Sequence, residues 1–523
     1  MMAQHGQQTS LDGLDEKEKG YISHTSGSPD AQEAAPDVVI VQRFEKFGGG
    51  FMSKIFAAGV EARGIERVLE DDRESKNSWN NLLMWWSVNT VLTTIPIGVL
   101  AQEFFTLTFA HTVAVTMCFG ALGAMATAFI ATLGPQTGCR TMIIARFSSG
   151  YVGGLIFSIF NILTQLGFSV VCLILGGQTL AAVNPGTLPL VVGVIIIAVG
   201  SLIPCFIGYQ FVHKYERYAW IITGIIMLFL WGLGGHAGFD LGAQKPLEAT
   251  DATLAGNILS FGGIVFSSFV GWAPVAADYN VRLPANTPPI RVFLLTFFGL
   301  WIPICFVTIL GAALMTISNP EYVDAFTNGG TGGLIAQVLS PWHGFGKFLL
   351  VLLALSCIQN NIVNTYSAGL SMQALGRPLA KIPRFLWTVL AFLIYTIAGV
   401  AGREHFSEIL SNFLAILGYW AAFFIVIVAE EHFIFRRSNG MLGGYNLDDY
   451  DSPSKLPVGI AGIAAGCVGI AGAVVGMDEV WYIGPIGEKI GDFGGDLGFE
   501  LAAIFAGACF PVFRYIEIRM TGR

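Results

Sequence analysis

The chain has 523 residues, of which 54% are hydrophobic and only 12% are charged. Because soluble globular domains carry about twice that charged fraction, this composition excludes an ordinary soluble protein and indicates a helical membrane protein with many spans. The net charge of −8 comes mostly from the ends and loops, and no basic patch with interleaved aromatic residues suggests nucleic-acid binding.

The N-terminal region is polar and is expected to lie outside the membrane. Residues 1–43 are predicted to be a disordered cytoplasmic segment. Residues 44–78 contain FMSKIFAAGVEARGIERVLE, which fits an amphipathic helix at the membrane surface or, equally well, a soluble helix on the cytoplasmic face. Lys17 and Lys19 are candidate sites for the ubiquitin machinery, although ordinary solvated lysines are the simpler interpretation.

Twelve apolar segments are long enough for a helix of about 20 residues, the length that crosses the hydrocarbon layer. Ten fall within residues 79–430, and two more fall within 456–516 after a polar cytoplasmic loop at 431–455. Where the core meets that loop, the side chains of Glu430, Glu431 and His432 are expected to be solvated, and residues 517–523 are expected to form a cytoplasmic end. The predicted spans are 82–102, 110–133, 150–177, 188–211, 218–236, 255–277, 291–317, 346–373, 384–402, 407–429, 456–476 and 497–516.

The distribution of positive charge gives the orientation. With an even number of spans both ends share one side, and that side holds 24 of the 28 lysines and arginines. Because positively charged loops stay in the cytoplasm, both termini are predicted to be cytoplasmic. The opposite side holds only Lys245, Lys347, Arg403 and Lys489.

Spans one and six contain helix-breaking sequences at corresponding positions, five spans apart. Span one reads MWWSVNTVLTTIPIG, and span six reads SFGGIVFSSFVGWAPVAADY. A matched pair of interrupted spans is the best sequence indication of a transporter's binding site, because unwound backbone leaves N–H and C=O groups free. The alternative is that each break is a kink packed against its neighbours.

Span eight carries Gln359, Asn360, Asn361 and Asn364 near its centre. Lipid offers these amides no hydrogen-bonding partners, so each must be satisfied inside the protein. Asn360 and Asn364 are four residues apart and project from one helix face. They predict a polar cavity at mid-depth, suited to a planar uncharged ligand that both donates and accepts hydrogen bonds.

Aromatic residues accompany these features and could hold a flat ligand by stacking. Taken singly, aromatic residues in spans are more often packing or interfacial residues. Gln165 in span three lies one turn before Phe168, and it either binds ligand or ties two helices together. The aromatic candidates are Trp85, Trp86, Phe168, Phe269 and Trp272.

Several blocks of the sequence resemble, in order, those of the fungal purine–cytosine permeases of the nucleobase–cation symporter 1 family. The resemblance runs from about Gly48 to Arg523. LPVGIAG, VWYIGPIG and GGDLGFEL in the last two spans are more particular to the fungal branch. The other blocks are GPQTGCRTMIIARFSSG (134–150), VHKYERYAW (212–220), GWAPVAADY (271–279), NNIVNTYSAGLSMQ (360–373), ILGYW (416–420) and EEHFIFR (430–436).

The resemblance implies an all-α fold with a ten-helix core of two inverted five-helix repeats, the LeuT-like arrangement, plus two extra helices. It implies inward transport of nucleobases or related heterocycles with a cation, which is a proton in the fungal branch and sodium in some bacterial relatives. Val88 and Thr365 are implied as part of an ion site by analogy alone. The implied substrate-binding residues are Ser87, Gln165, Phe168, Phe269, Asn360 and Asn364.

The sequence departs from the fungal pattern in three places. The fungal branch often has tryptophan at the position of Phe168, asparagine at that of Cys172 and proline at that of Val363. Because losing one hydrogen-bonding group can change substrate preference greatly, Cys172 and Val363 are candidate specificity positions. Trp272 in span six is a third candidate.

The leading hypothesis is a proton-coupled symporter of the plasma membrane that imports cytosine, or purines such as adenine and hypoxanthine, by alternating access. The alternatives are transport of vitamin B6 or a nucleoside, and a non-transporting receptor for the same ligands. No nucleophile–base set or metal-ligand cluster favours an enzyme, and no cofactor is expected besides the transported ion. Asp278, Glu408 and Glu500 stand at span ends, so the coupling residue is not assigned.

Overall fold

The computed structural model describes residues 64–73, 77–207, 209–242 and 251–523. The predictions for residues 1–43, for Lys17 and Lys19 and for most of the segment 44–78 lie outside these residues. Within residues 64–73, the chain forms a short 3-10 turn, η1 (Glu70–Asp72), and no longer helix.

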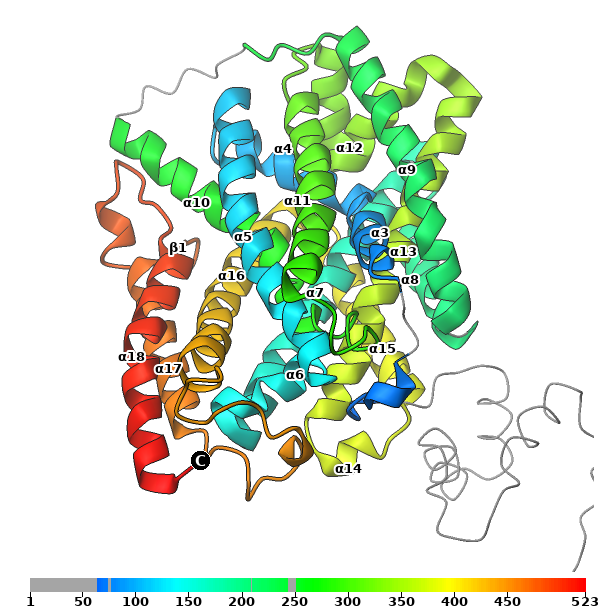
Figure 1. The fold of residues 1–523 in the computed structure, drawn as a ribbon. Coiled ribbons are helices and arrows are strands. Elements are labelled where there is room, and N and C mark those ends of the chain that lie inside the picture. The colour runs from blue at the N-terminus through cyan, green and yellow to red at the C-terminus, as the bar shows by residue number, and fades with distance from the viewer. Residues whose placement is uncertain (1–63, 74–76, 208, 243–250) are drawn as a thin grey trace, which may run out of the picture. The chain divides into compact units, whose positions relative to one another are not determined.

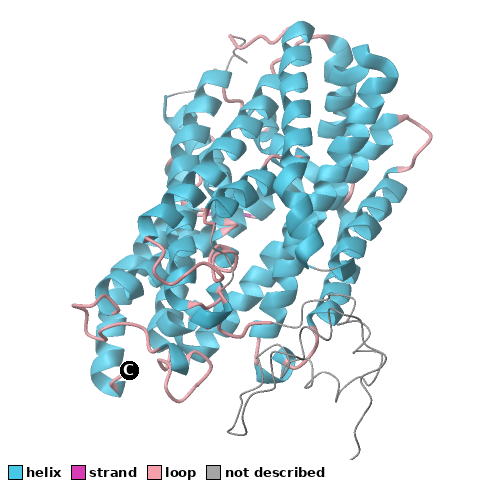
Figure 2. Ribbon diagram, turned by 45° about the vertical axis from the view of Figure 1, so that its right-hand side comes forward, coloured by secondary structure: helices cyan, strands magenta, loops and turns pink. Residues whose placement is uncertain are grey.

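The described chain is almost entirely helical (Figures 1 and 2). Its α-helices are α3 (Trp79–Asn89), α4 (Ile95–Glu103), α5 (Phe109–Thr137), α6 (Thr141–Ile144), α7 (Arg146–Val183), α8 (Leu190–Ile207), α9 (Tyr209–Ala237), α10 (Asp251–Val270), α11 (Pro289–Leu314), α12 (Pro320–Leu339), α13 (His343–Ala374), α14 (Arg377–Ala380), α15 (Arg384–Gly402), α16 (Phe406–Glu430), α17 (Ile460–Gly476) and α18 (Gly498–Thr521). The remaining short elements are η2 (Leu92–Thr94), η3 (Ala273–Val275), η4 (Ser340–Trp342), the π-helix η5 (Glu431–Phe435), η6 (Leu447–Asp449), η7 (Gly487–Lys489) and the antiparallel hairpin of β1 (Asp478–Glu479) and β2 (Tyr482–Ile483).

The described helices are consistent with the twelve predicted spans. Nine are long and apolar enough to cross a membrane, and the bent pair α3–α4 makes a tenth. The shorter apolar helices Leu190–Pro204 and Ile460–Gly476 occupy the two remaining predicted positions. Helix α12 was not predicted, because the polar, glycine-containing segment EYVDAFTNGGTGG hides it, and α18 runs on to Thr521 rather than stopping at 516.

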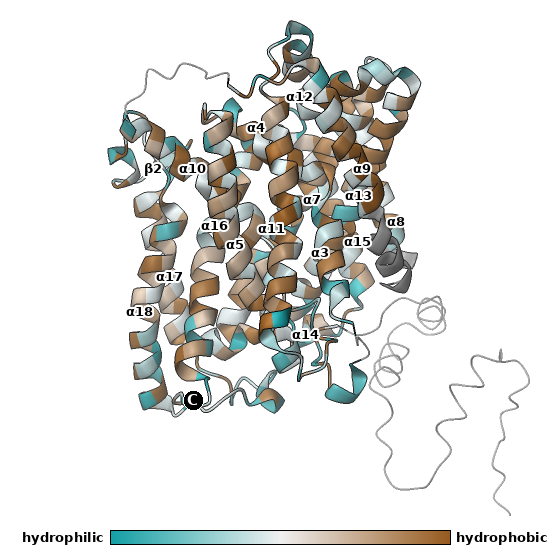
Figure 3. Ribbon diagram, turned by 45° about the horizontal axis from the view of Figure 1, so that its top comes forward, coloured by the Kyte–Doolittle hydropathy of each residue, from teal (hydrophilic) through white to brown (hydrophobic). Residues whose placement is uncertain are grey.

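The surface of the bundle has the polarity expected in a bilayer. Hydrophobic residues dominate the middle of the helices, and polar residues gather at the two ends (Figure 3). Large apolar side chains such as Leu163, Leu228 and Ile397 are 60–70% exposed on outer faces, which lipid tails would cover. Helices α6 and α14 and the C-terminus lie at the same end (Figure 1), the end to which the charge distribution assigns the cytoplasm.

The predicted interruptions in spans one and six are confirmed. Helices α3 and α4 meet at 67°. At the end of α3, the side chains of Asn89 and Thr90 donate to the carbonyl oxygens of Trp85 (2.8 Å) and Trp86 (2.7 Å). Such bonds satisfy last-turn carbonyls without a further helical turn, so they favour ending the helix. Helix α10 ends at Val270, and Pro274 lies in the 3-10 turn that follows.

The last two spans are joined to the rest of the bundle by a buried ion network at the end that holds the C-terminus. The Glu431 carboxylate accepts from Arg436 (2.8 Å) and Arg514 (2.9 Å), and Arg514 also donates to Glu517 (2.9 Å). Glu517 accepts from the backbone N–H groups of Gly459 and Ile460, which precede and begin α17. The expectation that Glu431 is solvated is therefore wrong, because its carboxylate is buried between Arg436 and an arginine distant in sequence, Arg514.

Candidate functional site

A small cavity lies at the first helix break, where α3 and α4 face α7, the end of α10, α13 and α16. Its volume is about 40 Å³, which is room for a few water molecules. None of its described lining residues carries a formal charge, so the cavity favours an uncharged occupant. The lining residues are Asn89, Thr93, Thr94, Ile97, Phe168, Val171, Cys172, Ser268, Trp272, Ile304, Asn360, Leu410 and Leu414.

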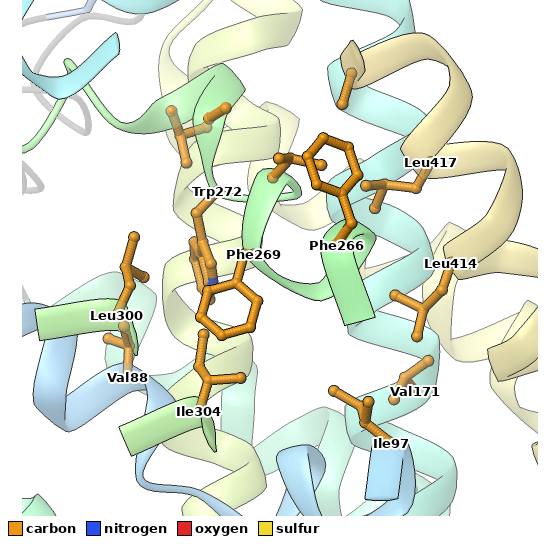
Figure 4. Packing of buried hydrophobic residues seen from close by; sticks show 14 of the residues in the cluster. Val88, Ile97, Val171, Phe266, Phe269, Trp272, Leu300, Ile304, Leu414 and Leu417 are labelled. Atoms are coloured by element: carbon orange, nitrogen blue, oxygen red, sulfur yellow. The ribbon is translucent and has the colours of Figure 1, made fainter. Parts of the chain in front are cut away.

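Two aromatic rings face each other at this cavity. The ring centroids of Phe168 on α7 and Trp272 after α10 are 6.2 Å apart, and their planes differ by 8°. The indole N–H of Trp272 donates to Asn89 Oδ1 (3.0 Å). Aliphatic side chains complete the wall: Ile97, Val171 and Leu414 converge from α4, α7 and α16 (Figure 4).

Asn360 of α13 and Cys172 of α7 form one polar part of the wall. Asn360 Oδ1 accepts from Asn364 Nδ2 (3.1 Å) and lies 3.3 Å from the sulfur of Cys172. Asn364 is fully buried behind Asn360, and its Oδ1 has no described hydrogen-bonding partner. The structure thus brings Cys172, Asn360 and Asn364 together, with Asn360 and Cys172 at the cavity itself.

The same amide row holds the unwound backbone of the first span. Asn360 Nδ2 donates to the Val88 carbonyl (2.7 Å), and Gln359 Nε2 donates to Ser87 Oγ (2.6 Å). The Thr365 hydroxyl donates to the Asn361 carbonyl of its own helix (2.8 Å). Ser87, Val88 and Thr365 are therefore engaged in contacts within the protein, and none of them lines the cavity; their roles in substrate or ion binding stay predictions.

Three other predicted residues also lie outside the cavity lining. The Phe269 ring packs on α5, where a Cβ at Gly120 would come within 2.9 Å of ring atoms and one at Gly123 would lie 2.7 Å from the Phe269 Cβ. Trp272 and not Phe269 therefore provides the ring opposite Phe168. Gln165 Nε2 donates to Asn161 Oδ1 (3.0 Å), while its Oε1 has no described partner. Val363 is buried within the uninterrupted helix α13.

Several lining residues were not singled out from the sequence. Asn89 was read only as part of the break in span one, although a polar residue beside Trp85 and Trp86 was the available signal. Thr94 looks like an ordinary hydroxyl residue of a span, and Leu410 and Leu414 look like ordinary apolar ones, whereas Ser268 stands out only as a hydroxyl in the interrupted span six. Their positions at the cavity follow from helix packing, which no local pattern encodes.

A wide cleft lies on one side of the cavity. It has a volume of about 1170 Å³ and is lined by the ends of α4 and α7, by α12, by the start of α13 and by residues 403–408. Along α16, Phe406 borders the cleft and Leu410 borders the cavity, one turn apart. The cleft opens at the end of the bundle opposite the C-terminus, where α12 lies (Figure 1).

The opposite side of the cavity is closed by aromatic side chains. Trp85 meets Trp272 and Tyr279 edge to face, with centroid distances of 5.7 and 5.5 Å. The Tyr279 hydroxyl lies 3.2 Å from Ser367 Oγ on α13. Next to it, the Asp278 carboxylate accepts from Thr141, and burial raises the pKa of Asp278 although Arg140 opposes the shift.

Residues 68–484 match a family model described as "Permease for cytosine/purines, uracil, thiamine, allantoin". The chain belongs to this family. It is 38% identical to the purine-cytosine permease FCY21 of Saccharomyces cerevisiae, over 90% of each chain. It is 32% identical to the vitamin B6 transporter TPN1 of the same yeast, over 92% of each chain. The permease is therefore a multi-pass membrane transporter of heterocyclic compounds, not an enzyme, and it falls within the fungal purine–cytosine branch.

The fold of the permease agrees with this assignment. A solved nucleobase–cation symport 1 family transporter, Mhp1 in a closed conformation with bromovinylhydantoin bound, superposes with a TM-score of 0.64 at 14% identity, covering 88% of this chain and 96% of that one. The expected LeuT-like fold of two inverted five-helix repeats with additional helices is thus confirmed.

Proposed function

We propose that the permease imports an uncharged nucleobase, cytosine or a purine such as adenine or hypoxanthine, together with a proton. The observation that carries this proposal is the pair of nearly parallel rings, Phe168 and Trp272, beside the amide of Asn360 in a cavity without charged walls. Stacking on aromatic rings contributes about 1–3 kcal/mol per base, and amides recognise the donor–acceptor edges of bases by paired hydrogen bonds.

The cavity must expand to admit such a ligand. A flat ring between two others needs about 3.5–4.0 Å on each face, hence about 7 Å between the outer rings. The Phe168 and Trp272 centroids are 6.2 Å apart, so their separation must grow and the cavity of about 40 Å³ must widen. We propose that substrate enters from the wide cleft, that the cavity closes around it, and that the aromatic closure then opens to the cytoplasm.

Proton rather than sodium coupling is supported by the backbone carbonyl oxygens at the break in span one, which already accept hydrogen bonds from side chains. The carbonyl oxygens of Ser87 and Val88, freed at the break, accept hydrogen bonds from Gln359 and Asn360. A sodium ion that used these oxygens would have to displace both amide donors. One charge crossing 100 mV supplies roughly 2.3 kcal/mol, which is about a 50-fold accumulation of substrate.

Vitamin B6 is the second candidate substrate. The 32% identity to a vitamin B6 transporter favours it, as does the cavity wall, where Cys172 offers a thiol near the Asn360 amide. A thiol is a weaker hydrogen-bonding group than an amide, so the site makes fewer polar demands on its ligand than one with asparagine at this position.

The test is uptake into cells that lack their own carriers. Radiolabelled cytosine, adenine, hypoxanthine, uracil and pyridoxine are supplied with and without a protonophore, and with sodium replaced by choline. We expect saturable uptake of at least one nucleobase that the protonophore abolishes and sodium removal leaves unchanged. Trp272→Ala at equal surface abundance is the inactive control. Uptake of pyridoxine alone would select the second candidate, and sodium-dependent uptake would refute proton coupling.

We also propose that the permease resides in the plasma membrane with both termini in the cytoplasm, and that ubiquitination of the N-terminal lysines controls its removal. The charge distribution and the common end shared by α6, α14 and the C-terminus support the orientation. Protease protection of epitope tags at each terminus in intact cells, and the surface lifetime of a Lys17→Arg, Lys19→Arg variant, test these points.

A further inference from the structure

Asn89 is the last residue of α3, at the point where the first span unwinds, and its side chain is 3% exposed. It lines the cavity, yet both ends of its amide are engaged within the protein. Nδ2 donates to the Trp85 carbonyl one turn back (2.8 Å), and Oδ1 accepts from the Trp272 indole N–H (3.0 Å). The amide therefore joins the broken end of span one to the tryptophan at the break in span six, just after α10.

The chemistry of the partners fixes the orientation of this amide. An indole N–H is only a donor and a backbone carbonyl is only an acceptor. Rotating the amide by 180° would set the NH₂ group against the Trp272 N–H and the oxygen against the Trp85 oxygen, losing both bonds. A single arrangement of Asn89 thus satisfies both partners, and it restricts the direction of the indole N–H.

The direction of that N–H restricts how the indole plane lies, because the N–H bond lies in the plane. Trp272 meets Trp85 edge to face at 72° and Phe168 face to face at 8°. An edge contact tolerates rotation of the indole, whereas the hydrogen bond to Asn89 does not. The parallel arrangement with Phe168, which stacking on a flat ligand requires, therefore depends on Asn89.

We propose that Asn89 is a positioning residue of the transport site: its carbonyl oxygen holds the Trp272 indole parallel to Phe168 before the substrate arrives. The role rests on the proposed function, because a preset stacking surface matters for a planar heterocycle. Preorganisation of this kind lowers the ordering cost of binding, so its loss raises KM more than it lowers the maximal rate.

A double-mutant cycle tests the role through uptake kinetics. Asn89→Leu, which removes the acceptor at similar volume, is expected to raise KM for the transported heterocycle roughly three- to tenfold, the factor that one net hydrogen bond supplies. In a Trp272→Phe background, which has no N–H, Asn89→Leu is expected to add less than a twofold effect. Equal effects of Asn89→Leu in both backgrounds would overturn the proposal.

A matched control separates positioning from general loss of structure. Asn81 lies on the same helix and is also buried, but its Nδ2 donates to Thr296 Oγ1 on α11 (2.9 Å), away from the cavity. Asn81→Leu is expected to lower the amount of folded permease and leave KM unchanged. A KM increase in this variant equal to that of Asn89→Leu would overturn the assignment of a specific role to Asn89.

A second readout needs no substrate. The same cycle is measured by thermal unfolding of the purified full chain in detergent, where Asn89→Leu and Trp272→Phe should be non-additive because they remove one shared contact. Additive shifts would show that the contact is absent and would overturn the inference even in an active transporter. If the shifts in unfolding temperature are non-additive but the permease transports none of the offered compounds, the proposed function is refuted and the Asn89–Trp272 contact is still established.

Discussion

Asn360 and Asn361 are neighbours on α13 with different surroundings. The Asn360 amide donates to the Val88 carbonyl and accepts from Asn364, and it faces the cavity. Asn361 is fully buried, and neither its Oδ1 nor its Nδ2 has a hydrogen-bonding partner among the described residues. A rotation of one residue along the helix thus separates an amide that donates to the backbone at the break in span one from an amide that does not.

Replacing these two residues separates their contributions. Asn360→Ala leaves the Val88 carbonyl without its donor and removes the amide from the cavity wall. We expect a 10- to 100-fold loss of kcat/KM for uptake, corresponding to roughly 1.4–2.8 kcal/mol. Asn361→Ala, the control of equal size change on the same turn, should stay within about threefold of wild type. Equal losses of kcat/KM in both variants would show that shortening any buried amide of α13 impairs transport, and that the contacts of Asn360 have no special role.

At this scale, sequence reasoning found part of the polar cluster beside the cavity. It predicted that Asn360 and Asn364 share a helix face with polar surroundings, because period 3.6 and the absence of partners in lipid are local properties. It placed Phe269 among the substrate-binding residues and Trp272 only among the candidate specificity positions, whereas Trp272 is the one that lines the cavity. Both follow the same glycine-containing stretch, and only the position of Gly120 and Gly123 on α5 shows which ring has space elsewhere.

Two interrupted helices meet α13 at different depths. The break in span one contacts α13 through Asn360, and the chain after α10 contacts it through Tyr279, whose hydroxyl lies 3.2 Å from Ser367 Oγ. Because Trp85 packs edge-on against Tyr279, the three aromatic residues Trp85, Trp272 and Tyr279 close the cavity on the side away from the cleft. We therefore expect the hydroxyl contact to break when that side opens.

Removing the hydroxyl contact should favour the opened form. Tyr279→Phe keeps the ring but loses a bond of about 1 kcal/mol, which shifts a two-state equilibrium roughly fivefold. The measurement is the labelling rate of an introduced Ser371→Cys thiol, one turn further along α13, by an impermeant maleimide applied from the side of the termini. We expect faster labelling than in the parent with Tyr279 intact.

The contact also predicts how the variants combine. Ser367→Ala should accelerate labelling as Tyr279→Phe does, and the labelling rate of the double variant should not exceed that of either single variant. Ser158→Ala is the matched control, because that hydroxyl donates to the Gly154 carbonyl of its own helix (2.8 Å). Unchanged labelling in both Tyr279→Phe and Ser367→Ala would mean that another contact holds this end closed.

Over the whole molecule, the last two spans attach to the transport core at both ends of the bundle. At the end opposite the ion network, the Tyr419 hydroxyl on α16 donates to Glu479 of β1 (3.0 Å) and also contacts Asp496 before α18. A hydroxyl has one hydrogen, so it cannot donate to both carboxylates at once. Burial and mutual repulsion raise the pKa of Glu479 to about 8, and burial, with a contribution from Asp478, raises that of Asp496 to about 6.

These shifts predict that stability falls as pH rises. Carboxyl groups with raised pKa values in the folded state hold protons that the unfolded chain releases near pH 4, so their stabilisation is present at low pH and is lost as pH passes through about 6 and 8. Glu479→Gln should reduce the loss of stability at the higher pH values, near the pKa of about 8 of Glu479. The measurement is the melting temperature in detergent at pH 5.5, 7 and 8.5.

A substitution in the same loop provides the control. Glu488 is exposed, and Glu488→Gln should preserve the pH dependence of the wild type. A melting temperature of the wild type that rises between pH 5.5 and 8.5, or a Glu479→Gln profile that matches it, would contradict the buried-carboxylate explanation.

The sequence by itself determined the order of the apolar segments and the positions of the two broken spans. These depend on composition and on helix-breaking residues within a short stretch of chain, so they can be read one segment at a time. Only the tertiary structure decided which side chains face the cavity. Trp272 is selected over Phe269, Asn89 becomes its partner, and Glu431 is paired with Arg514, because each of these outcomes depends on a contact between residues more than 80 positions apart.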